Sequence, residues 1–265
     1  MIVQAFVAGI GVLGPGLAGW AETRSVLRGE RPYACAPTVL PAPTLLPAAE
    51  RRRTGRVVKL ALAVAAQATA HAAVEPAQLR SVFSASGGDG ENCHELCQSL
   101  AAPAREVSPT RFSNSVHNAP AGYWSIATGA TAPSTVLCAF DGSFCAGLLE
   151  AMVQVSVDEE RILLVVYDAQ YPEPMRAKRP VPDAFGAALV LTPARQPSSL
   201  ARLRASIGGE SIERLAQPGL EALRSANPAA RALPLLRRLA LARSDRTVLE
   251  YLEDSSVTVQ VEPCA

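Results

Sequence analysis

The chain has 265 residues, of which 49% are hydrophobic and 18% are charged, a composition typical of a globular protein and not of a disordered one. Its 25 Lys and Arg side chains balance 24 Asp and Glu side chains, so no excess positive charge favours binding to nucleic acid or to an anionic membrane. Aromatic residues make up only 5%. Small and branched aliphatic side chains must therefore build the core, and we expect an α/β protein.

Cysteine usage and the apolar N-terminus bear on the location of the protein. The six cysteines are irregularly spaced, which is not the pattern of a disulfide framework; they are Cys35, Cys93, Cys97, Cys138, Cys145 and Cys264. The apolar start has no Lys or Arg before its apolar run and is interrupted by glycines, so we expect a strand and a turn there and not a signal peptide. No run of about 18 apolar residues is present, as a membrane span would need. We therefore expect a cytoplasmic protein.

The first half of the chain alternates β-prone runs with helical patterns. We expect strands at residues 2–8 and 79–84, and helices at residues 20–27, 51–73 and 93–101. The sequence GIGVLGPG after the first strand has the glycines of a turn. Its GxGxxG spacing also occurs in dinucleotide-binding sites, but no acidic residue follows a second strand at the usual distance, so nucleotide binding is not expected.

The stretch from Ser108 to Val155 is the most informative one. It predicts a helix at residues 122–127, a β-prone run at 134–139, a sharp FDGS turn and a helix at 144–154. Such an elbow exposes the residue at its turn and aims a helix N-terminus at whatever binds there. Beyond it we expect strands at 162–167 and 187–192, then mostly Arg- and Leu-rich helix to about residue 242, and a final strand in SVTVQVEP.

The order of these blocks resembles the N-terminal half of the β-ketoacyl synthases, the condensing enzymes of the thiolase fold. The matching blocks are VAGIGVLGPG, RRRTGRVVKLALA, SVFSASGGDG, VSPTRF and NAPAGYWSIATGATAPST. In particular, FSNSVHNAPAGYWSIATG followed by GLLEA is similar to the chain length factors of aryl polyene and xanthomonadin-type biosynthesis. The resemblance implies a layered α/β/α/β/α fold, with a synthase-like half at residues 1–195 and a shortened, helical C-terminal part with a final strand at residues 196–265.

The elbow departs from the pattern of the catalytic members, which carry a nucleophilic cysteine there. Aligning the helix that starts after Gly142 puts Ala139 at the nucleophile position, with Cys138 beside it. Counting forward from Pro133 without a gap puts Asp141 there instead. We interpret the elbow as degenerate.

The histidines depart from the pattern as well. Catalytic members use two histidines from the second half of the fold, whereas His71, His94 and His117 all precede the elbow here. Decarboxylative condensation generates an enolate-like anion, whose stabilisation needs positioned donors such as imidazole N–H groups. We therefore expect no catalytic residue and no cofactor, and a chain that does not catalyse condensation alone.

The resemblance instead implies a partner role. In this fold the strand that leads to the elbow pairs with its equivalent across a dimer, and the segment before it borders the partner's acyl channel. We therefore expect a non-catalytic subunit that forms a heterodimer with an active β-ketoacyl synthase, meets the acyl carrier protein through that complex and limits product length. The residues expected at the interface or in the pocket are Val116, His117, Asn118, Tyr123, Trp124, Ser134, Thr135 and Phe140.

Two alternatives stay open. A small acyltransferase or hydrolase of the same fold would use Cys138 with a base such as His117, and a homodimeric acyl-binding module would need no ketosynthase. Asn118 also suits the cap of the helix that follows it.

Two further motifs have plainer interpretations. Cys93 and Cys97 share one helix face, but His94 lies about 100° around the helix from Cys93, and a structural zinc site needs four ligands. Helix packing is therefore favoured over a metal site. The run RRRTGR is typical of a solvated helix start, with docking of an acidic carrier protein as the alternative.

Overall fold

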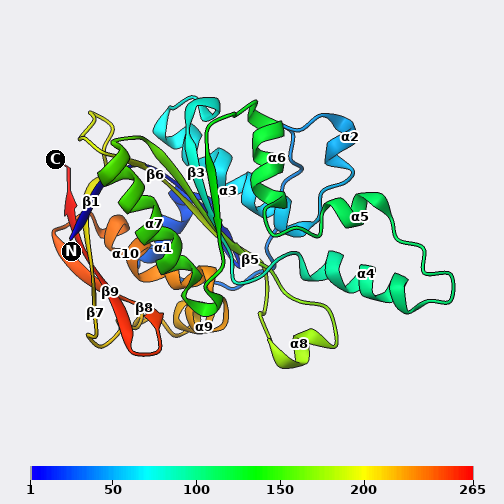
Figure 1. Cartoon of the computed structure of the whole chain (residues 1–265). Coiled ribbons are helices and arrows are strands. Elements are labelled where there is room, and N and C mark those ends of the chain that lie inside the picture. Colours follow the sequence, from blue (N-terminus) through cyan, green and yellow to red (C-terminus); the bar gives the residue numbers. More distant parts are fainter. Residues whose placement is uncertain (1, 265) are drawn as a thin grey trace.

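The computed structural model describes residues 2–264 and shows a mixed α/β protein, as expected (Figure 1). Its strands are β1 (Val3–Gly14), β2 (Leu17–Ala18), β3 (Arg80–Ser84), β4 (Ser134–Leu137), β5 (Ile162–Asp168), β6 (Phe185–Thr192), β7 (Ala201–Gly208), β8 (Asp245–Leu252) and β9 (Ser255–Pro263). Its α-helices are α1 (Trp20–Leu27), α2 (Ala48–Arg51), α3 (Arg56–Ala72), α4 (Gly90–Ala101), α5 (Pro109–Ser113), α6 (Ala119–Thr128), α7 (Ser143–Asp158), α8 (Met175–Lys178), α9 (Pro218–Ala226) and α10 (Leu233–Leu241). Short 3-10 helices are η1 (Pro76–Gln78), η2 (Phe140–Gly142) and η3 (Ala229–Ala232).

All strands belong to one sheet, ordered β4-β3-β5-β6-β1-β7-β9-β8, with β2 paired to the end of β1. β3 runs parallel to β4 and to β5, and the remaining pairs are antiparallel. The carboxyl ends of the three parallel strands therefore meet at one end of the sheet, where α/β sheets place their ligand sites. β4 forms an edge of the sheet, so one side of its backbone has no neighbouring strand within the described residues.

The sheet curls around a central helix, α7. This helix packs on β1, β3 and β5 and also reaches β8, while α3 and α6 cover the opposite face (Figure 1). Two hydrophobic cores result, one between α3, α6 and the sheet, and one that joins α7 and α10 to the inner faces of β7 and β9. Helices therefore cover both faces of the sheet in the N-terminal part of the chain.

β1 continues through the glycines that the sequence assigns to a turn, so that expectation is wrong for most of GIGVLGPG. The reason is the close approach of α3. A Cβ atom at Gly11 would lie 2.1 Å from the carbonyl oxygen of Val64, and one at Gly9 would lie 2.2 Å from that of Ala68. Glycine is needed there because α3 lies against the strand backbone, and the chain turns only after Gly14.

The region after Ser198 is less helical than expected to about residue 242, because it contributes the strand β7, and β8 follows before the expected final strand. In β7, Ala201, Leu203 and Ala205 are buried while Arg204 is exposed, which is the alternation of a half-buried strand. The helical part is confined to α9, η3 and α10. The division of the chain into two parts at residue 195 stays a proposal. The strands β1 and β7, which lie on opposite sides of that division, pair in one sheet.

The other expected elements are confirmed, with ends shifted by a few residues: α1, α3, α4, α6, α7, β3, β4, β5, β6 and β9. The helices α5 and α8 were not expected. Within residues 2–264, no helix combines the length and the apolar character that crossing a bilayer requires.

Candidate functional site

The turn between β4 and α7 has the elbow geometry expected from the sequence. Its apex is η2, and the Ser143 hydroxyl closes it by donating to Phe140 O at 2.7 Å and accepting the Ala139 N–H at 3.0 Å. Phe140 has a left-handed φ of 49°, which is unfavourable for a residue with a Cβ atom. Its side chain is 61% exposed. Local hydrogen bonds thus hold an aromatic ring outward at the apex.

The candidates for the nucleophile position have different surroundings. The Cys138 thiol donates to Ser86 O at 3.3 Å. Asp141 uses both carboxylate oxygens, because Oδ1 accepts from Arg179 at 2.7 Å and Oδ2 accepts from Arg231 at 3.1 Å. Ala139 has no functional group. The only charged side chain of the three is therefore engaged by two guanidinium groups.

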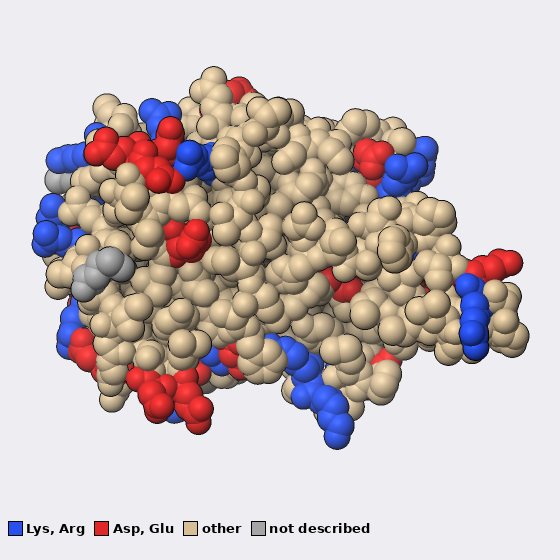
Figure 2. Space-filling view, in the orientation of Figure 1, with Lys and Arg blue, Asp and Glu red and all other residues tan. Residues whose placement is uncertain are grey.

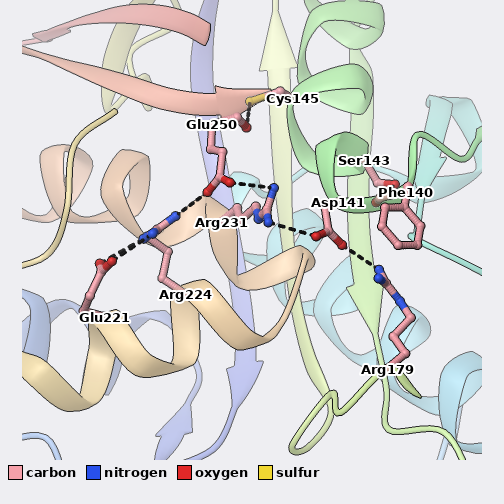
Figure 3. Close-up of polar contacts among 9 residues, drawn as sticks. All are labelled: Phe140, Asp141, Ser143, Cys145, Arg179, Glu221, Arg224, Arg231 and Glu250. Carbon is pink, nitrogen blue, oxygen red and sulfur yellow. Dashed lines mark hydrogen bonds and ion pairs between the residues drawn. The ribbon is translucent and has the colours of Figure 1, made fainter. Parts of the chain in front are cut away.

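These arginines belong to a longer series of ion pairs, drawn in Figure 3. Arg231 also contacts Glu250 at 3.3 Å, and Arg224 joins Glu250 at 2.9 Å to Glu221 at 2.8 Å. The hydrogen bond from Arg224 lowers the pKa of Glu221. Because Arg231 lies on η3, Arg224 on α9 and Glu250 on β8, the series fastens the elbow to the C-terminal part of the chain.

An open hollow of about 680 Å³ adjoins the elbow and extends to the turn between β8 and β9. Phe140 forms part of its wall, with the Arg179 guanidinium 3.8 Å above the ring centre, a cation–π arrangement. Glu210, Glu253 and Asp254 also line it. The hollow is therefore wide and open to water, and most of its charged lining residues are acidic.

Asp168 is a buried acid at the carboxyl end of β5. The backbone N–H and the hydroxyl of Ser86 donate to its Oδ1 at 2.9 and 2.6 Å. Burial raises the pKa of Asp168 to about 7, although the bonds from Ser86 lower it, because a charged carboxylate is disfavoured away from water. Ser86 thereby links Asp168 to Cys138 beneath the elbow.

The segment expected to wall a partner's pocket divides into buried and exposed residues. Trp124 is 1% exposed and Tyr123 is also buried, both in this chain's own core, and the Tyr123 hydroxyl donates to Asn114 at 3.0 Å. Trp124 therefore has almost no surface to offer a partner, whereas Tyr123, although buried, still borders the hollow between α5 and α6. Val116 and Ile126 are exposed and line an open hollow of about 460 Å³ between α5 and α6.

His117 and Asn118 lie before α6. Asn118 occupies the N-cap position, but its side chain makes no capping hydrogen bond, so the expected cap is wrong. Burial lowers the pKa of His117, against a hydrogen bond with Gly87 that raises it. Within residues 2–264, no hydrogen bond joins His117 to the Cys138 thiol, which the acyltransferase alternative would use.

The expected pairing residues on β4 are tied to this chain. The Ser81 hydroxyl donates to the Ser134 hydroxyl at 3.0 Å, and Gln154 donates to the Thr135 hydroxyl at 3.1 Å. These bonds fix β4 against β3 and α7. Among the described residues, no three His, Cys, Asp or Glu side chains are grouped as a metal site would require.

Similarity to known proteins identifies the family of this chain. A family model for the β-ketoacyl synthase N-terminal domain matches residues 24–249. The chain belongs to that family. The match continues past residue 195, where the resemblance in the sequence ends, into β8. A search of curated proteins found no match.

Solved structures share the fold of this family member over the full length of both chains. A ketosynthase (ApeO) in complex with its chain length factor (ApeC), from Xenorhabdus doucetiae, contains a chain that is 21% identical with a TM-score of 0.74, over 97% of this chain and 99% of that one. The structure of the ishigamide ketosynthase/chain length factor contains a chain that is 13% identical with a TM-score of 0.72, over 99% of this chain and 100% of that one. The AntDE:AntF complex, a type II PKS acyl-carrier protein in complex with its ketosynthase bound to the hexaketide, contains a chain that is 10% identical with a TM-score of 0.74, over 100% of both chains. The chain thus has a thiolase-like ketosynthase fold, as expected.

Proposed function

We propose that this chain is a non-catalytic, ketosynthase-like subunit that forms a heterodimer with an active β-ketoacyl synthase and shapes its acyl pocket, as a chain length factor does. The observation that carries the proposal is the free edge of β4 within a largely uncharged face. Figure 2 shows that the surface over α7 and α6 has few Lys, Arg, Asp or Glu side chains, which gather at its rim. A depletion of charge is typical of the centre of a protein interface.

The apolar side chains of this face come from several elements. Leu137 of β4 and Leu149 and Val153 of α7 are only partly buried, and they line a hollow of about 430 Å³ that Ile207 of β7 also borders. Val157, near the end of α7, is exposed. A contiguous apolar surface of this kind marks an interaction site.

The hydrogen bonds of β4 show which of its groups are free to pair. The Ser81 N–H donates to Pro133 O, and the Ala85 N–H donates to Leu137 O. Since the groups of one strand alternate in direction, those of Thr135 also face β3, whereas the N–H groups of Ser134 and Val136 face the open edge. An unpaired edge is a template for a strand of another chain.

The elbow supports the non-catalytic part of the proposal. Nucleophilic catalysis needs an activated nucleophile beside a base. Here Asp141 is held by Arg179 and Arg231, and the Cys138 thiol donates to a backbone carbonyl. The acyl carrier protein would then be met through the complex, with condensation carried out by the partner.

Val116 belongs to the segment that the family resemblance places beside the partner's channel, and its apolar side chain is exposed, as is that of Ile126 just beyond this segment. We expect Val116→Trp to shorten the products of the reconstituted pair by filling that channel, while Val116→Ala leaves them equal or longer. Product lengths are read by mass spectrometry. Equal product lengths for both variants, with activity intact, would remove this segment from the pocket.

A proline at position 136 tests the β4 edge. Val136→Pro removes an outward N–H and leaves the bonds of β4 to β3 in place, because proline is tolerated on edge strands. Val136→Ala is the matched control, since it also shortens the side chain but keeps the N–H. We expect Val136→Pro to weaken association with the synthase by about tenfold or more, equivalent to about 1.4 kcal/mol, and Val136→Ala to bind nearly as the wild type. Equal affinities for both would argue against pairing through β4.

A further inference from the structure

An arm formed by residues 89–116 extends away from the sheet (Figure 1). It contains α4, a connecting loop and α5. Asp89 caps α4 by accepting the Asn92 N–H at 3.1 Å, and the Asn92 side chain donates to Arg111 O at 2.8 Å. Arg111 forms an ion pair with Glu95. The first turns of α4 are thus bonded to α5, and the arm is built as one unit.

The apolar side of α4 lacks a cover from this chain. Cys93, Leu96, Cys97 and Leu100 recur at the spacing of one helix face, yet both cysteines are exposed and Leu100 is 55% exposed. Phe112, on α5, is exposed as well. A single helix of this length is marginal in water without packing of its apolar face. The stripe therefore has the character of a contact surface that a second protein covers.

The arm is continuous with the face assigned above to the synthase. Pro109 and Ser113 of α5 line the same open hollow as Val116 and Ile126. In Figure 2 the weakly charged surface runs on from α6 over the arm, with few charged groups before its far end. A subunit paired along β4 would meet this surface next.

The charges of the arm bear on the kind of partner. The helix α4 carries Glu91 and Glu95 and no Lys or Arg. Because Arg111 of α5 pairs with Glu95, α4 offers an acidic carrier protein no basic side chain to bind, whereas an apolar surface with few charges needs none. The stripe thus favours the synthase over the carrier protein.

We propose that the apolar stripe of the arm, formed by Cys93, Leu96, Cys97 and Leu100, packs against the same β-ketoacyl synthase subunit and extends the interface beyond β4. The proposal rests on the proposed function, because it takes its partner from there. The arm would then form a second part of the subunit interface.

The protein's own cysteines test this directly. Cys93 and Cys97 report on the stripe, Cys138 lies beside the β4 edge, and exposed Cys35, outside both surfaces, is the reference. Each is labelled with a maleimide in the free chain and in the purified complex, and rates are compared by mass spectrometry of the peptides. We expect labelling of Cys93, Cys97 and Cys138 to slow by tenfold or more in the complex, with Cys35 unchanged.

The other outcomes separate the two proposals. Protection of Cys138 with unchanged labelling of Cys93 and Cys97 would overturn the role of the arm and leave the β4 interface standing. A synthase that forms no complex at all would overturn both. Protection of Cys93 and Cys97 that depends on the concentration of the free chain would show that a second copy covers the stripe, which also overturns the proposal.

A pair of substitutions provides a second readout. Leu96→Asp with Leu100→Asp places two negative charges on the stripe, and Gln98→Asp places a single negative charge on another exposed face of α4. Circular dichroism of both variants verifies that the chain remains folded. We expect the double variant to bind the synthase at least tenfold more weakly and Gln98→Asp to bind as the wild type. Equal binding by both variants would contradict a contact between the arm and the synthase.

Discussion

Trp124→Ala tests whether the Trp124 side chain packs in the core of this chain or lines the pocket of a partner. Trp124 is 1% exposed and lies on α6 in the core shared with α3. Its truncation removes buried apolar surface and leaves a cavity, which costs about 3–5 kcal/mol for a tryptophan. For a domain of this size, about 2–4 °C in Tm is lost per kcal/mol, so we expect Tm to fall by about 6–20 °C. Thermal unfolding followed by circular dichroism, with a urea titration, measures the change.

The matched control is Ile126→Ala on the same helix, where the side chain is 54% exposed. A surface substitution changes stability by about 0.5 kcal/mol or less, and alanine is also the better helix former. We therefore expect Tm to stay within about 2 °C. The reasoning would be refuted if Trp124→Ala left Tm unchanged and altered only the products of the pair, because the side chain would then lie in the partner's pocket.

Three further changes have defined outcomes. Gly11→Ala places a Cβ atom 2.1 Å from Val64 O, so we expect a loss of about 1–3 kcal/mol in urea unfolding; no loss would mean that α3 moves away freely. Arg231→Met removes the contacts to Asp141 and Glu250, whose side chains are 39% and 32% exposed, so after screening we expect a loss of about 1–2 kcal/mol that shrinks in 1 M salt; a loss that is the same in salt would contradict an ionic origin. Asp168 has a folded-state pKa raised from 3.8 to about 7, so the folded chain binds more protons than the unfolded chain between about pH 4 and 7, and this group makes stability fall as pH rises through that window. We expect Asp168→Asn, compared with the wild type by urea unfolding at each pH, to remove that component and to gain relative stability toward pH 8; parallel pH profiles would contradict it.

The local pattern of the sequence was sufficient for most of the fold. The β4-elbow-α7 unit and the helix α3 follow from periodicity and turn residues, because each depends on neighbours close in the chain. β7 was missed because its Arg and Leu content is typical of helices, although its alternation has period two. The glycines of β1 were assigned to a turn because their need, the approach of α3, arises only in the folded chain.

The position of the candidate site in the chain could be predicted from the sequence, but its side-chain contacts could not. The elbow and β4 were located from the sequence, whereas Arg179 and Arg231, which lie 38 and 90 residues from Asp141, were not. Nothing in local spacing indicates such pairs. Trp124 was expected at the interface because its segment was, and only the orientation of α6 shows that its side chain turns inward. Side-chain direction is set by tertiary packing, which a segment match does not contain.

The most direct test is the mass of the assembly that this chain forms when it is co-expressed with the β-ketoacyl synthases of its own cell. We predict a stable complex with one synthase, whose mass by light scattering equals one copy of each chain, formed by the wild type and by Val136→Ala and weakened by Val136→Pro. A chain that stays monomeric, or that pairs only with itself while those synthases are present, would contradict a role as a ketosynthase partner.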